Sequence, residues 1–111
     1  MNWYLAKMVF RIVCGEGLHK PQFDEQFRFI YAGNREEALR KALDTGISEE
    51  DKFLNIHKQP VHWKFITVPE LHKVELIEDG AEVFSKIKEV DDGDHYLYIV
   101  NQKAKLLAAN L

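Results

Sequence analysis

The chain lacks the residues for an internal disulfide bond and the long apolar run of a membrane-spanning helix. Its 111 residues include one cysteine, Cys14, which can form no disulfide within the chain. No apolar stretch approaches the roughly 20 residues that a helix needs to cross a bilayer. The amino terminus also lacks the basic and then apolar run of a secretion signal. We therefore expect a soluble protein of the reducing cytoplasm.

The chain also lacks an excess of positive charge. It has 15 Lys and Arg against 18 Asp and Glu, which gives a formal net charge of −3 at pH 7. This balance provides no net attraction to a phosphate backbone or to an anionic bilayer. We expect neither nucleic acid nor a membrane as a partner.

The alternation of apolar and polar residues predicts two strands at the start of the chain. In residues 3–13 the even positions form one apolar face, and in residues 23–31 the odd positions do so. The loop between them, residues 15–21, contains two glycines and a proline and suits an antiparallel hairpin. We expect this loop to be exposed and mobile.

A helical period follows the second strand. Asn34 is the expected N-cap, Glu37 completes a capping box, and Gly46 is expected to end the helix as its C′ residue. The apolar stripe of this helix consists largely of small residues, which predicts close packing against a sheet. It is formed by Ala38, Leu39, Ala42 and Leu43.

The rest of the chain predicts a meander of short strands. We expect strands at 53–56, 61–68, 71–77 and 81–87, with the strand at 61–68 central because both of its faces are partly apolar. Pro69 is expected to interrupt the chain after that strand, and Asp79-Gly80 is a hairpin turn signal. Residues 96–100 fit a last strand or the start of a helix, and residues 102–109 predict a terminal helix.

These patterns predict an α+β fold in a single domain, residues 1–111. Its antiparallel sheet has five to six strands, with one helix after the second strand and a C-terminal helix, in the order β-β-α-β-β-β-β-(β)-α. The residues do not decide whether the terminal helix packs on its own sheet or on that of a second copy.

Five blocks of residues, in this order, resemble a family. They are Trp3, Tyr4, Ala6 and Lys7; Phe23-Asp24-Glu25; Glu37-Ala38 and Ala42; Val61, Trp63, Lys64 and Phe65; and Asp79-Gly80, Glu82-Val83 and Ser85. Over residues 2–88 the chain resembles the bacterial family catalogued as domain of unknown function 4288. The resemblance implies a small bacterial protein with no assigned activity, and so no catalytic residues to carry over. Residues 89–111 lie outside it and form a C-terminal extension, expected to be helical.

Two histidines flank the expected turn between 53–56 and 61–68. If Gln59 and Pro60 are the central turn residues, His57 and His62 face each other and could share a metal ion or ligand. If proline takes the second turn position, His57 faces Lys64 and the site disappears. A zinc site also needs further ligands, and surface histidines on a hairpin tip are the more frequent case. His72, Glu75 or Asp79 would have to supply those ligands.

Other candidate chemistry is weaker still. Cys14 and His19 would form a nucleophile and its base only within about 3 Å of each other, and no third orienting group is evident. Asp91, Asp92 and Asp94 lack the late glutamate of a calcium loop. Gly15-Glu16-Gly17 places an acid where a phosphate would approach. We expect no catalytic residue and no cofactor.

Aromatic residues beside basic ones can form a stacking platform for bases. Trp3, Tyr4, Trp63 and Phe65 are the aromatic residues in question, with Lys7, Arg11, Lys64 and Lys86 as the basic ones. Core packing is the expected role for most of these rings. The odd positions of the first strand would instead form a protein contact if the helix covers the even ones. These positions are Trp3, Leu5, Lys7, Val9 and Arg11.

One or two helices are too few to cover both faces of such a sheet, and a second copy is the simplest cover for the remainder. We therefore expect a homodimer that works as a non-catalytic protein-binding or accessory module for an unknown protein partner. The loop at 15–21 and the hairpin tip at 57–60 are further expected contacts. The alternative is a small-molecule- or metal-binding protein or an enzyme that uses the open sheet face. Its polar wall groups would be His62, Lys64, Glu82 and Lys86.

Overall fold

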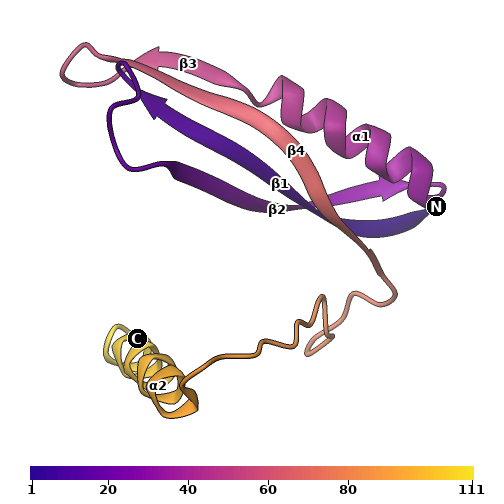
Figure 1. Ribbon diagram of the computed structural model, residues 1–111. Coiled ribbons are helices and arrows are strands. Elements are labelled where there is room, and N and C mark those ends of the chain that lie inside the picture. The colour runs from indigo at the N-terminus through magenta and orange to yellow at the C-terminus, as the bar shows by residue number, and fades with distance from the viewer.

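The computed structural model describes residues 1–111 and has an α+β fold (Figure 1). Its elements are β1 (Asn2–Cys14), β2 (Gln22–Ala32), α1 (Arg35–Ser48), β3 (Asp51–Leu54), β4 (Pro60–Val74) and α2 (Gly93–Ala109). The four strands form one antiparallel sheet in the order β2-β1-β4-β3. The class, the first hairpin and the central place of the strand that contains residues 61–68 are confirmed, whereas the number of strands is smaller than predicted.

α1 packs closely on one face of this sheet, as its stripe of small residues predicts. Ala38 and Ala42 of the helix are completely buried, as are Met8 and Phe10 of β1. Alanine lets the helix approach the strands, so the larger side chains of β1 fill the space between the two layers. The core therefore lies between α1 and the even positions of β1.

The start of α1 follows the predicted capping residues, but its end does not. The Asn34 side chain accepts a hydrogen bond from the Glu37 backbone N–H at 2.8 Å, and the Glu37 carboxylate accepts one from the Gly33 N–H at 3.0 Å. Gly46 does not end the helix, which continues to Ser48. Gly46 is buried, and a Cβ there would lie 2.2 Å from Cε1 of Phe65. This glycine provides room for an aromatic ring of the sheet.

β4 continues through Pro69, where an interruption was predicted. Between Lys7 and Val9 of β1 the pairing with β4 shifts register, so Pro69 lies in an irregular part of the ladder that does not require its missing N–H. β4 ends at Val74, which pairs with Trp3 near the start of β1. Residues beyond Val74 have no strand to pair with, and the strand predicted at 71–77 is accordingly part of β4 only in its first half.

The strand predicted at 81–87 is wrong. The Asp79-Gly80 turn does form, because Gly80 has φ +81° and the Ala81 N–H donates to the Glu78 carbonyl at 3.1 Å. Its two arms nevertheless do not pair, and residues 75–92 form a linker without helix or strand. The turn signal was correct, but no sheet edge receives the strands on either side of it.

α2 begins at Gly93 and includes residues 96–100, so the helical alternative for that segment is the correct one. The Asp92 side chain accepts a hydrogen bond from the His95 N–H at 3.0 Å and caps the helix. α2 contacts no other element, and none of its residues is buried. Figure 1 shows it at the end of the linker, on the side of the sheet opposite α1. No helix of the protein combines the length and the apolar character that crossing a bilayer requires.

Candidate functional site

The face of the sheet that α1 leaves uncovered is formed by the odd positions of β1 and β2. Trp3 pairs with Tyr31, Leu5 with Phe29 and Lys7 with Phe27. Residues paired in an antiparallel ladder project to the same side, so these side chains share one surface. We call this surface the open face. It comprises Trp3, Leu5, Lys7, Val9 and Arg11 of β1, Phe23, Glu25, Phe27, Phe29 and Tyr31 of β2, and His62, Lys64, Glu70 and His72 of β4.

Aromatic side chains dominate the β2 side of the open face. Phe27 is 48% exposed, Phe29 53% and Phe23 54%. The Trp3 ring contacts Tyr31 at a centroid distance of 4.7 Å and meets Phe29 edge to face at 6.1 Å. The rings pack on one another but keep about half of their surface in water, which is unusual for a group of neighbouring aromatic residues.

The five residues of β1 that the sequence marked for contact do share this face, as their alternation predicts. Leu5 is nevertheless buried at 7% exposure, because its neighbours on the face enclose it. Their role in binding another protein remains a prediction. The sequence interpretation did not include the aromatic residues of β2 in this surface. The predicted hairpin pairs odd positions of the first strand with odd positions of the second, and this pairing would have placed those residues beside the five positions of β1.

A compact ion-pair network lies in the centre of the open face. The Lys7 ammonium lies 2.9 Å from the Glu25 carboxylate and 3.1 Å from that of Glu70, and Nε2 of His72 lies 3.3 Å from Glu70. The hydrogen bonds to Glu25 and then Glu70 raise the pKa of Lys7 above its usual 10.5. The hydrogen bond from Lys7 lowers the pKa of Glu70 below its usual 4.5. The Lys7 ammonium is thus paired with two carboxylates, and the Glu70 carboxylate links it to the His72 ring.

The linker contacts the open face through Phe84. The Phe84 ring lies 4.2 Å from the His72 ring and 6.2 Å from the Phe27 ring, measured between centroids. Phe84 is half-buried there, while the linker residues around it are exposed. The segment that leads to α2 is thus anchored at the middle of the open face.

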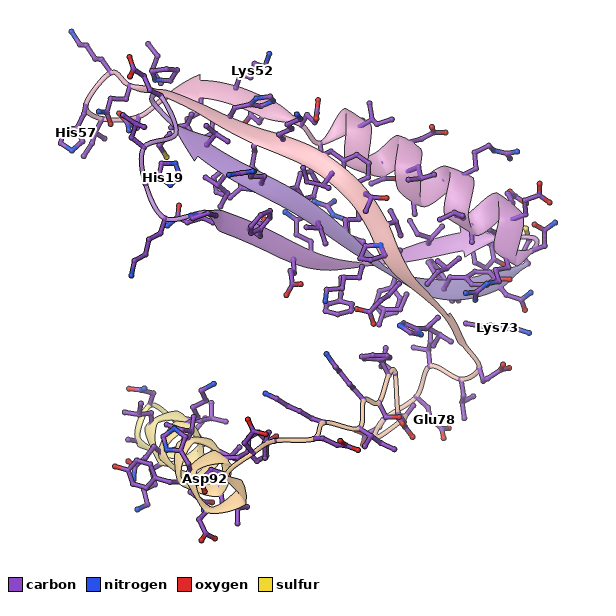
Figure 2. The ribbon with its side chains drawn as sticks, viewed as in Figure 1. His19, Lys52, His57, Lys73, Glu78 and Asp92 are labelled. Carbon is purple, nitrogen blue, oxygen red and sulfur yellow. The ribbon has the colours of Figure 1, made fainter.

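The two histidines of the second hairpin do not face each other. Leu54 pairs with Pro60 and Lys52 with His62, so residues 55–59 form the loop and both predicted turn registers are wrong. His57 lies at the loop tip, apart from Lys52 at the strand (Figure 2). Asn55 explains the longer loop, because its side chain accepts hydrogen bonds from the N–H groups of both His57 and Gln59.

His62 and Lys64 lie on the open face, opposite Val13 and Arg11 of β1. Nε2 of His62 is buried and has no hydrogen-bond partner. Glu82 and Lys86 belong to the linker, so the four predicted polar wall groups are not aligned on neighbouring strands. No group of three or more His, Cys, Asp or Glu side chains is placed to hold a metal ion.

The His19 ring binds the backbone near Cys14 instead of its thiol. Nε2 accepts a hydrogen bond from the Cys14 N–H at 3.1 Å, and Nδ1 lies 2.8 Å from the Lys20 carbonyl, to which it can donate. These partners assign the neutral tautomer with its proton on Nδ1. Both ring nitrogens therefore interact with backbone groups and hold the 15–21 loop in place. Neither nitrogen is available to accept a proton from the Cys14 thiol.

The aromatic platform for bases does not form. Tyr4 is buried beneath α1, and Trp63 and Phe65 lie on the helix side of the sheet while Trp3 lies on the open face. The Trp63 indole N–H donates to the Asp24 carboxylate at 3.0 Å. Three of these four rings thus serve the packed layer.

The two loops expected as contacts meet at one end of the sheet. The Gly15 N–H donates to the Pro60 carbonyl at 2.7 Å, and Figure 2 shows His19 and His57 at this same end. An open hollow of about 730 Å³ lies between them, lined by residues that include Cys14, His19 and Gln59. Leu18 and Ile56, one in each loop, are 88% and 93% exposed.

Comparison with known proteins gives one match. No curated protein and no solved structure is significantly similar to the chain. The family described as Domain of unknown function (DUF4288) matches residues 3–85, which comprise the sheet, α1 and the linker as far as Ser85. This match covers most of the chain and leaves α2 outside. The chain is therefore a member of the family Domain of unknown function (DUF4288).

Proposed function

We propose that this protein is a small, non-catalytic binding module of the cytoplasm that works as a homodimer and contacts other proteins. The observation that carries this proposal is the open face, where aromatic side chains remain half exposed on one side of a sheet whose other side is packed. A soluble monomer rarely leaves a contiguous apolar surface of this kind unoccupied, and such surfaces typically mark protein contacts.

The gain from covering the open face is large. Burial of an aromatic side chain removes about 150–250 Å² from water, so rings that are half exposed retain on the order of 100 Å² each. At about 25 cal/mol per Å², each ring contributes roughly 2 kcal/mol when it is covered. Phe23, Phe27 and Phe29 together contribute about 6 kcal/mol toward an association cost of about 4–15 kcal/mol.

The charged groups at the centre of the open face fit a protein contact better than a catalytic role. Lys7 is paired with Glu25 and Glu70, so a partner that covers the ammonium need not supply an anion for it. The exposed apolar tips Leu18 and Ile56 offer a second contact at the end of the sheet. Loops held by a rigid scaffold commonly carry such contacts.

The proposal is tested by sedimentation equilibrium of the full chain and two variants. Phe29→Glu places a charge on the open face, and Ile47→Glu places one on α1 at a similarly exposed apolar site on the other side of the sheet. We expect the native chain to sediment as a dimer, Phe29→Glu to shift strongly to monomer, and Ile47→Glu to remain dimeric. A native chain that stays monomeric at high concentration, or a dimer that both variants weaken equally, would refute the proposal.

A further inference from the structure

α2 is a well-formed helix with nothing packed on it. It touches no strand and no part of α1, and none of its residues is buried. Leu97 is 56% exposed and Leu107 67%. In proteins most of the stability of a helix comes from the packing of its apolar face. α2 therefore has an apolar surface that no other element of the chain covers.

The apolar residues of α2 are too widely distributed for one sheet to cover them. Residues 96–100 are five consecutive apolar residues, Tyr-Leu-Tyr-Ile-Val, which span more than one full turn. Val100, Ala104 and Leu107 continue along one side, and Ile99 and Leu106 along another. A helix on a single sheet needs one stripe, as α1 has, whereas a helix that is apolar on several sides is enclosed.

The chain exposes more surface than a compact monomer of its mass, as expected if another surface covers α2. The folded chain exposes 8870 Å² and has a radius of gyration of 17.9 Å. A compact chain of 13.0 kDa exposes roughly 6,300 Å², and about 13 Å is the usual radius near this length. The excess of roughly 2,500 Å² per chain corresponds to about 5,000 Å² for a pair, within the range of obligate dimers.

We propose that α2 of each chain covers the open face of a second copy, so that two sheets with their open faces toward each other enclose the two α2 helices. This inference rests on the proposed function and names the element that fills its interface. A helix between two sheets buries apolar residues on both of its sides, which the distribution in residues 96–100 requires. Folding back on its own sheet would leave one of these sides in water.

The linker fits the same arrangement. Phe84 anchors it at the middle of the open face, beside Phe27 and His72, and the chain then leaves the sheet toward α2. From Phe84 to Gly93 an extended segment reaches roughly 30 Å, enough to carry α2 onto a facing copy. Figure 1 shows α2 held away from its own sheet on this side.

The inference is tested by cross-linking a mixture of isotope-labelled chains. Equal amounts of ¹⁴N and ¹⁵N protein are unfolded, refolded together and treated with an amine-reactive reagent, and the linked peptides are analysed by mass spectrometry. We expect links from Lys103 or Lys105 of α2 to Lys7 or Lys64 of the open face, with light and heavy peptides joined in the same product. Only links within one isotope would show that α2 folds on its own sheet, and would overturn the inference.

A matched pair of variants tests the helix face independently. Val100→Glu lies on the apolar side of α2 with Ala104 and Leu107, whereas Asn101→Glu lies on the polar side with Asp94 and Lys105. We expect Val100→Glu to raise the dimer dissociation constant about tenfold or more, as loss of a central interface residue does, and Asn101→Glu to leave it nearly unchanged. Equal effects of the two variants would overturn the inference.

These outcomes separate the inference from the function on which it rests. A native chain that is monomeric by sedimentation refutes both. A dimer that Phe29→Glu dissociates, but that yields no mixed links between α2 and the open face, refutes only the placement of α2.

Discussion

Gly46 is the position where one added methyl group has the most predictable effect. It lies inside α1, is buried, and faces the Phe65 ring of β4. A Cβ built there lies 2.2 Å from Cε1 of Phe65 and 2.5 Å from both Cδ1 and Cζ. Three ring atoms would have to move, and the ring already packs on Phe10 at a centroid distance of 5.5 Å.

Two opposing contributions set the effect of Gly46→Ala on the free energy of unfolding. Alanine is favoured over glycine in a helix interior by about 1 kcal/mol, whereas overpacking a core costs about 1–3 kcal/mol. Because the clash is with an aromatic ring held by its own neighbours, we expect overpacking to dominate, with a net destabilisation of about 1 kcal/mol. For a chain of this size that lowers Tm by about 4 °C.

The background variant Phe65→Ala reverses the sign. Without the ring the new methyl group has room, so Gly46→Ala should then stabilise the protein by about the 1 kcal/mol of helix propensity. Gly93→Ala is the matched control, because a Cβ there meets nothing within 4 Å. The assay is urea unfolding followed by tryptophan fluorescence at one fixed protein concentration, because the stability of any oligomer depends on concentration. Stabilisation by Gly46→Ala in the native background, or equal effects in both backgrounds, would refute the reasoning.

Three further changes have outcomes that follow from single contacts. The lowered pKa of Glu70 means that this group stabilises the fold above pH 4.5 and loses that contribution as the pH falls, whereas the raised pKa of Lys7 means that it stabilises the fold below pH 10.5 and loses that contribution as the pH rises. Lys7→Met should therefore flatten the pH dependence of the urea midpoint at both ends, and an unchanged profile would contradict this. Asn34→Ala should cost about 1 kcal/mol in the same assay through loss of the N-cap of α1, and Asn34→Ser should largely restore it. Phe84→Ala should release the linker from the open face and speed tryptic cleavage after Lys86, a result that equal cleavage rates would exclude.

The sequence predicts this fold best where a pattern needs no distant partner. Alternation located the first two strands to within a residue at each end, and Asn34 with Glu37 marked the start of α1. The predicted interruption at Pro69 and the predicted helix end at Gly46 were wrong, because contacts with other elements decide the structure at both positions. A register shift accommodates the proline, and an aromatic ring from another element uses the space beside the glycine.

The linker shows a different limit of sequence patterns. Residues 81–87 alternate as a strand does, and the turn before them forms. A strand also needs a neighbouring edge, however, and the ladder between β4 and β1 ends at Val74, opposite Trp3 at the start of β1. Alternation shows that a segment could present one apolar face as a strand, but the segment forms a strand only where another strand offers a free edge for hydrogen bonds.

The composition of the two faces of β2 explains why its aromatic face is left open. α1 presents small residues, Ala38 and Ala42, and approaches closely where β2 offers Ile30 and Ala32. The ring-bearing positions Phe27 and Phe29 would hold such a helix farther away and leave voids beside its alanines. Larger apolar side chains complement rings, and α2 supplies these in residues 96–100. In the arrangement proposed above a second layer covers the rings of β2, and α2 is the element that has large apolar side chains and contacts no other element of its own chain.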